Sequence, residues 1–193
     1  MTRRYQLKRR AERQNDTRQR IVEATVELHT TLGPAHTSIL AIAERAGVER
    51  PTVYRHFPTT ESLITACSTH FRTQNPAPNP EPWLKIDAPD ARLRRGLGEL
   101  YAYYAAQESA LWNVLRDLDD RADLRQFLGE DARLHQRFID VLLSAWPSDR
   151  KNSKLRAAVG HATDFFAWRS LKRQGLSNEE AAEMMVEFVQ RAQ

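Results

Sequence analysis

The chain has 193 residues, 41% of them hydrophobic, and a formal net charge of +4, a composition that allows a folded core. No stretch comes near the roughly 20 consecutive apolar residues that a bilayer span requires, and the basic N-terminus lacks the apolar segment of a signal peptide, so we do not expect a membrane protein. Cys67 is the only cysteine, which excludes an intrachain disulfide and fits a cytoplasmic location.

Positive charge is concentrated near the N-terminus. Residues 1–60 contain 11 Lys and Arg against 6 Asp and Glu, whereas residues 61–193 contain 18 against 19. Such a distribution is typical of a chain that binds nucleic acid with one end. We expect residues 1–15 to form a basic flexible arm, because they carry almost no apolar side chain. The arm is interpreted either as a solvated tail or as a segment that follows DNA phosphates or enters a minor groove.

The first predicted helix covers residues 16–32. Its apolar and small side chains recur at helical spacing, at Ile21, Thr25, Leu28 and Leu32. Gly33 and the proline after it then stop the helix.

The stretch that follows has the layout of a helix-turn-helix. Thr37 or Ser38 can cap a first short helix, and Gly47 suits the left-handed residue that ends it. A second short helix begins near Pro51, since proline is tolerated in a first helical turn, and Pro58 closes it.

One side of this second helix carries side chains suited to reading nucleic acid. Val53 and Phe57 can face a core, which leaves the polar residues pointing elsewhere. Arginine can fork onto guanine or phosphate, threonine can contact a thymine methyl, and tyrosine or histidine can donate to phosphate oxygens. The alternative is a helical hairpin within a core, with an ordinary polar outer face. The exposed set is Arg50, Thr52, Tyr54, Arg55 and His56.

Residues 43–63 follow the order AxxAGVxxxTVYRHFxxxExL, carried by Ala43, Ala46, Gly47, Val48, Thr52, Val53, Tyr54, Arg55, His56, Phe57, Glu61 and Leu63. This order closely resembles the DNA-binding domain of the tetracycline-repressor (TetR) family of bacterial transcriptional regulators, over roughly residues 17–65. The resemblance implies an all-helical homodimer that binds a palindromic double-stranded DNA operator and is released from it by a small molecule. The DNA contacts that it implies are Thr37, Ser38, Arg50, Thr52, Tyr54, Arg55, His56 and Thr60.

Two positions depart from the family pattern. Glu49 stands where the family often has a serine or threonine that caps the recognition helix, and Thr60 stands where it commonly has a lysine that contacts the DNA backbone. Both departures remove favourable charge at the DNA, so they affect the expected phosphate contacts and leave the expected fold unchanged.

A fourth helix is predicted over about residues 60–73, with Cys67 as a packing residue. Residues 75–90 hold five of the nine prolines, which breaks helical structure and predicts a stiff linker anchored by Trp83 and Leu84. We therefore expect a DNA-binding domain over residues 16–74 and a second domain over residues 91–193.

The second domain reads as five further helices, which brings the expected total to about nine in an all-α fold without strands. Ser177 and Glu180 can form a capping box for the last helix, and Gly175 can end the helix before it. The other predicted helices cover residues 91–107, 108–118, 124–146 and 153–174.

Aromatic side chains of the second domain can border a pocket for an apolar or planar ligand. His161 and Asp164, three residues apart on one predicted helix, can orient that ligand. The alternatives are core packing for each aromatic and, for the polar pair, hydrogen bonds within the protein or exposure to solvent. The candidate ligand-binding residues are Tyr101, Tyr104, Trp112, Phe138, His161, Asp164, Phe165 and Trp168.

The last two predicted helices carry long apolar stripes, and the resemblance implies that this pair forms a four-helix bundle between two subunits. The candidate interface residues are Phe166, Met184, Met185 and Phe188, and the alternative is that the stripes pack only within their own subunit. Paired DNA-reading heads also suit half-sites roughly 34–36 Å apart.

The sequence contains no constellation typical of an enzyme, so we expect no catalytic residues, no metal site and no cofactor. The leading hypothesis is a ligand-responsive transcriptional repressor. The alternative is a sequence-nonspecific or architectural DNA-binding protein without a ligand.

Overall fold

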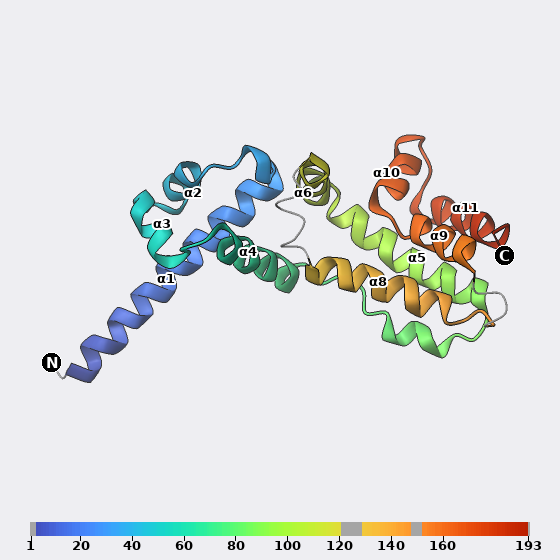
Figure 1. Ribbon diagram of the computed structural model, residues 1–193, viewed down its shortest axis with the longest axis horizontal. Coiled ribbons are helices and arrows are strands. Elements are labelled where there is room, and N and C mark those ends of the chain that lie inside the picture. The colour runs from blue at the N-terminus through green and yellow to red at the C-terminus, as the bar shows by residue number, and fades with distance from the viewer. Residues whose placement is uncertain (1–2, 121–128, 148–151, 193) are drawn as a thin grey trace. The chain divides into compact units, whose positions relative to one another are not determined.

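The computed structural model describes residues 3–120, 129–147 and 152–192. Within these ranges it contains ten α-helices and two short 3-10 helices and no strand, which confirms the all-α prediction (Figure 1). The chain divides into two compact units, one formed by Met1–Pro76 with Ser109–Leu128 and the other by Ala77–Glu108 with Gly129–Gln193. None of the described helices combines the length and the apolar character needed to cross a bilayer.

The first unit contains the predicted helix-turn-helix. α1 packs against both α2 and α4, and α2 packs against α3. The core between these helices includes Ile21, Ile42, Val53, Phe57 and Leu63, each no more than 3% exposed. The helices of this unit are α1 (Arg3–Thr31), η1 (Pro34–His36), α2 (Ile39–Ala46), α3 (Arg50–His56), α4 (Thr60–Gln74) and most of α6 (Glu108–Asp120).

Local capping chemistry sets the ends of the short helices. The Ser38 hydroxyl accepts from the Ala41 amide at the start of α2, and Gly47 ends α2 in the left-handed region at φ 63°. Thr59 and Ser62 form a reciprocal capping box at the start of α4. These caps satisfy backbone groups that have no partner inside the helix, and they confirm the predicted turn at Gly47.

The N-terminal basic segment is helical, which differs from the flexible arm expected over residues 1–15. α1 begins at Arg3 and continues without interruption to Thr31. The segment contains no glycine or proline, and its Arg, Lys, Gln, Glu and Ala residues are good helix formers. Low apolar content therefore did not prevent a helix here, because the segment extends a helix whose later turns are anchored in the core.

α6 closes the C-terminal end of α1 through side-chain hydrogen bonds. The Asn113 amide donates to the carbonyls of Thr30 and Thr31 at 2.8 and 3.0 Å. Arg116 donates to the Leu32 carbonyl at 2.9 Å, and the buried Asp117 carboxylate accepts from the Ala35 amide at 2.9 Å. The bonds from Asn113 and Arg116 satisfy carbonyls at the end of α1, and Asp117 satisfies an amide of η1. They group α6 with the first unit, although its residues were expected in the second domain.

The second unit is a helical body in which α11 packs along α5 and also against α9. Its core includes Trp83, Leu97, Leu142, Leu155 and Val186, each no more than 1% exposed. The unit contains η2 (Glu81–Lys85), α5 (Pro89–Ala106), α8 (Gly129–Leu143), α9 (Ser153–Ala162), α10 (Phe165–Arg173) and α11 (Asn178–Gln190).

The expected extended linker contains a 3-10 helix, η2. As predicted, Trp83 anchors it, being fully buried and donating from its indole nitrogen to Glu99 at 2.8 Å, whereas Leu84 is exposed. Arg92 is also buried and donates to the carbonyls of Leu84, Ile86 and Val141 and to the Ser144 hydroxyl. A single guanidinium thus ties η2 to α5 and α8.

The expected single helix over residues 153–174 is wrong, because the structure divides it into α9 and α10. Asp164 is the N-cap of α10, and its carboxylate accepts from the Ala167 amide at 2.9 Å. Aspartate favours a cap over a helix interior because its side chain competes for backbone donors. The described part of the helix predicted over residues 124–146 is α8, while residues 124–128 lie outside the described residues.

Candidate nucleic-acid interface

α3 is held to the first unit by one side and exposed on the other. Val53 and Phe57 are 0% and 3% exposed and pack in the core, and Pro51 lies in the first turn. Because successive side chains turn by about 100° around a helix, these anchors force the intervening residues outward. Tyr54 is 44% exposed and Arg55 is also exposed.

The exposed side chains of α3 are linked in pairs. Arg50 donates to the Tyr54 hydroxyl at 3.1 Å, and its guanidinium lies 5.5 Å from the centre of the Tyr54 ring. Arg55 donates to the Thr52 hydroxyl at 3.4 Å. These bonds hold each guanidinium in a defined position on the surface, and its other N–H groups can donate to an external acceptor.

His56, the last residue of α3, lies in a cationic environment. Burial and the neighbouring charges of Arg55 and Arg18 lower the pKa of its imidazole. The Arg18 guanidinium also lies 4.7 Å from the centre of the Phe57 ring. The helix thus ends in a region of positive charge built from both α1 and α3.

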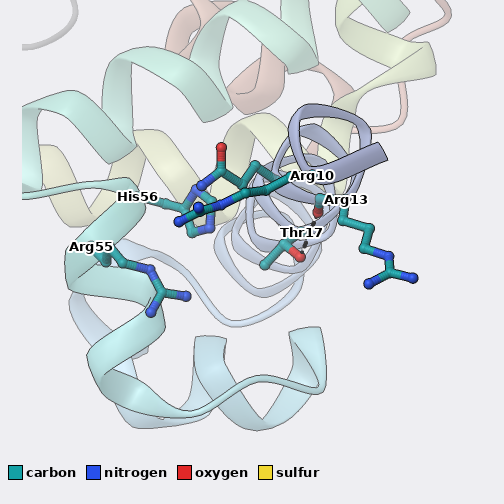
Figure 2. Close-up of a pocket in the computed structure, with 6 residues that line it drawn as sticks. Arg10, Arg13, Thr17, Arg55 and His56 are labelled. Atoms are coloured by element: carbon teal, nitrogen blue, oxygen red, sulfur yellow. Dashed lines mark hydrogen bonds between the residues drawn. The ribbon is translucent and has the colours of Figure 1, made fainter. Parts of the chain in front are cut away.

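A hollow of about 350 Å³ opens between α1 and the end of α3 (Figure 2). In Figure 2 the Arg10 side chain extends toward His56, and Thr17 lies nearby on α1. Arg10, Arg13 and Gln14 belong to the basic arm predicted over residues 1–15, whose individual contacts were not predicted, and Thr17 was not predicted to belong to this site. The available signal was their spacing, since positions 10, 13, 14 and 17 share one face of a helix. The lining residues are Arg10, Arg13, Gln14, Thr17, Arg55 and His56.

The remaining predicted DNA contacts lie at helix ends of the same unit. Thr37 donates its hydroxyl to the Gly33 carbonyl at 2.8 Å, and Ser38 caps α2. Thr60 is exposed in the first turn of α4, where Thr59 provides the cap. Glu49 is the N-cap residue of α3 but forms no side-chain cap bond, so its carboxylate does not accept from the first amides of α3.

The predicted ligand-binding aromatics of the second unit are packed against one another. The ring centres of Tyr104 lie 5.4 Å from Phe165 and 5.6 Å from Trp168, and Phe138 lies 5.6 Å from Trp83. All of these rings are less than 9% exposed. Trp112 lies on α6 and belongs to the first unit.

The hydroxyls of two of these tyrosines cap the break between α9 and α10. Tyr101 donates to the Ala162 carbonyl and Tyr104 to the Thr163 carbonyl, both at 2.7 Å. His161 is exposed with its ring 5.8 Å from that of Phe188, and Asp164 caps α10. The helix break therefore separates the polar pair that was expected to share one helical face.

The candidate interface residues fall into two groups, exposed and buried or partly buried. Met184 and Phe188 are 46% and 45% exposed on α11, four residues apart and hence on one face. Met185 is 8% exposed and belongs to the core, and Phe166 on α10 is partly buried. The apolar face available for a partner is thus narrower than the predicted stripe.

Across the described ranges, no three His, Cys, Asp or Glu side chains are grouped as a metal site would require. Cys67 is 5% exposed, and burial raises the pKa of its thiol to about 11. The thiol therefore stays protonated near neutral pH, consistent with the predicted packing role.

Comparisons with known proteins agree with this geometry. The family profile described as "Bacterial regulatory proteins, tetR family" matches residues 21–67, which contain α2 and α3. An HTH-type transcriptional repressor of Mycobacterium tuberculosis is 41% identical over 54 residues, which are 28% of this chain and 29% of that protein. An HTH-type transcriptional regulator of Mycobacterium bovis matches with the same identity and coverage. The match thus spans less than a third of either relative.

Solved structures share the fold over most of the chain. A TetR-like transcriptional regulator from Rhodococcus sp. RHA1 has a TM-score of 0.59 at 19% identity, covering 91% of this chain and 94% of that one. NalD from Pseudomonas aeruginosa, described as the secondary repressor of the MexAB-OprM multidrug efflux pump, has a TM-score of 0.61 at 24% identity, covering 94% and 97%. The chain is thus similar to the tetR family of bacterial regulatory proteins over the helix-turn-helix, and it shares the fold of these solved regulators in both units.

Proposed function

We propose that this chain is a DNA-binding transcriptional regulator that inserts α3 into the major groove of double-stranded DNA. The observation that carries the proposal is the exposed side of α3, where two arginines, a tyrosine and a threonine project from a helix anchored by Val53 and Phe57. A helical hairpin buried in a core would not expose this set of polar side chains. A recognition helix exposes such side chains to base edges and phosphates.

The side chains of α3 differ in the DNA contacts that their chemistry allows. Arg50 and Arg55 suit bidentate contacts with guanine or a phosphate, and Thr52 suits a thymine methyl. Tyr54 and His56 suit phosphate oxygens, which set register without reading sequence. Helix-end hydroxyls complete the proposed phosphate contacts, at Thr37, Ser38 and Thr60.

We further propose that the chain acts as a homodimer on a palindromic operator. The exposed Met184 and Phe188 on α11 support an interface there, because large apolar side chains gain free energy when a partner removes them from water. A two-fold dimer presents two copies of α3 to half-sites roughly 34–36 Å apart.

Repression relieved by a small molecule is the proposed regulation. The proposed effector is apolar or planar, since such ligands bind among aromatic side chains, and the packed rings around Tyr104 and Trp168 would have to separate to admit it. The effector would shift the protein between two states only by its difference in affinity for them, and DNA affinity would change by the same coupling free energy.

The second candidate is a nonspecific or architectural DNA-binding protein. The cationic face of α1 favours it, because contacts from arginines to phosphates give affinity without sequence preference. The two candidates differ in how binding responds to sequence and salt.

The deciding experiment measures binding of the full chain to the DNA upstream of its own gene and to a scrambled duplex, at two salt concentrations. A regulator prefers the upstream duplex and keeps that preference at higher salt. Arg50→Ala should abolish much of the preference, at a cost of roughly 1–3 kcal/mol. Arg94→Ala is the matched control, since Arg94 is an exposed arginine of the second unit that pairs with Glu183. Equal binding of both duplexes that disappears with salt would refute the regulator and support the architectural protein.

A further inference from the structure

The N-terminal part of α1 carries two separate stripes of charge. Lys8, Glu12, Asp16 and Arg20 are spaced by four residues, and they pair as Lys8 with Glu12 at 3.9 Å and Arg20 with Asp16 at 3.7 Å. This stripe therefore balances its own charge, as ion pairs four residues apart on a helix commonly do.

The second stripe lines the hollow beside α3 and is not balanced. Arg10 and Arg13 form no ion pair with a carboxylate in the part of the chain that the structure describes, and the lining of the hollow contains neither Asp nor Glu. Across the hollow, α3 contributes Arg55 and His56 (Figure 2). Three guanidinium groups thus line one hollow whose described lining contains no carboxylate, which makes their surroundings strongly attractive to an oxyanion.

We propose that this hollow is a binding site for one phosphate group of the DNA backbone, shared between α1 and α3. The site rests on the proposed DNA-binding function and adds to it a phosphate clamp formed by Arg10, Arg13 and Arg55. A DNA phosphate is the favoured oxyanion because Arg55 belongs to both the hollow and the exposed side of α3. A phosphate bound here would lie beside the groove that α3 enters, so its contact with Arg10 and Arg13 would help to set the position of α3 in the groove.

The site also accounts for the two positions that weaken the usual phosphate contacts. Glu49 provides no cap bond at the start of α3, and Thr60 carries no positive charge at the start of α4. Arg10 and Arg13 supply positive charge at the opposite end of α3, where His56 ends the helix. The proposed clamp thus places positive charge at the end of α3 that lies beside α1.

The test compares two double variants that remove the same charge from the same helix. Arg10→Gln/Arg13→Gln removes two unpaired positive charges from the hollow. Lys8→Gln/Arg20→Gln removes two positive charges that are paired with carboxylates on the same helix. Glutamine keeps the helix propensity close to that of arginine and lysine, and circular dichroism verifies it. Binding of each full-length protein to a fluorescein-labelled duplex of about 30 bp, roughly three turns, is measured from low to high salt.

We expect Arg10→Gln/Arg13→Gln to weaken binding roughly 10-fold at low salt and to reduce the slope of log K against log salt by about 0.9 for each subunit bound. The control should change the slope by much less. Equal slopes for the two variants, with wild-type binding intact, would overturn the phosphate clamp and leave the proposed function standing. Absence of wild-type binding to any duplex would overturn both.

A second measurement separates a DNA phosphate from a free anion. Inorganic phosphate is titrated into the wild-type protein and into Arg10→Gln/Arg13→Gln at constant ionic strength, with calorimetric detection. Phosphate binding that requires Arg10 and Arg13, combined with an unchanged DNA salt slope, would assign the hollow to a free anion and overturn the proposal.

Discussion

The break between α9 and α10 depends on two tyrosine hydroxyls from α5, and removing them should destabilise the protein. Tyr101 and Tyr104 donate to the carbonyls of Ala162 and Thr163, both at 2.7 Å, and both carbonyl-bearing residues are fully buried. The substitutions Tyr101→Phe and Tyr104→Phe keep the rings and remove only these donors. Each leaves a buried carbonyl without a partner, which costs roughly 1–3 kcal/mol.

The expected loss is measurable by calorimetry or urea unfolding. A domain of this size loses roughly 2–4 °C in Tm for each kcal/mol, so each variant should melt several degrees below the wild type. The two carbonyls belong to consecutive residues, so the double variant should deviate from additivity. Tyr54→Phe is the matched control, because Tyr54 is 44% exposed and its loss should stay within about 0.5 kcal/mol.

The same variants have a distinct signature at high pH. Burial raises the pKa of both hydroxyls above the ordinary tyrosine value. As pH rises above about 10, the unfolded chain loses these protons first, so stability falls with pH, and the fall should be smaller in the Phe variants. Unchanged Tm values for both variants would refute the capping role, and unchanged stability combined with altered effector affinity would instead support a ligand contact.

Three further changes test other parts of the structure. Gly33→Ala should destabilise the first unit by roughly 1–3 kcal/mol or more in urea unfolding, because Gly33 has φ 100° and an added Cβ would clash with the Asp117 carboxylate. Burial lowers the pKa of His29 to about 4, so the free energy of unfolding should fall by at most roughly 3 kcal/mol as pH drops from about 6.5 toward 4. His29→Gln should lessen that fall in urea titrations across this range. An equal fall in both proteins would show that His29 is not the group responsible. Arg92→Met should cost about 3 kcal/mol by chemical denaturation, since buried carbonyls lose their donor, and a loss below about 0.5 kcal/mol would show that water replaces the guanidinium.

Much of the helix-turn-helix was predictable because its signals are local. Ser38 caps α2, Gly47 takes the left-handed conformation, and Phe57 and Val53 recur at the spacing of a buried face. Each of these features depends on residues within one or two helical turns, where backbone chemistry determines conformation with little help from the rest of the chain. The capping box at Ser177 was predictable for the same reason.

The tertiary structure decided features that depend on partners far apart in sequence. Aspartate is a common N-cap residue, so Asp164 alone does not predict a helix break. The break is also stabilised by tyrosine hydroxyls from a helix about 60 residues earlier, which donate to its buried carbonyls. Low apolar content suggested a flexible arm, whereas α1 continues through this segment and places Arg10 beside Arg55. Hydrophobic spacing determines which face of a helix is buried, and only the packed chain determines which charged side chains of separate helices meet.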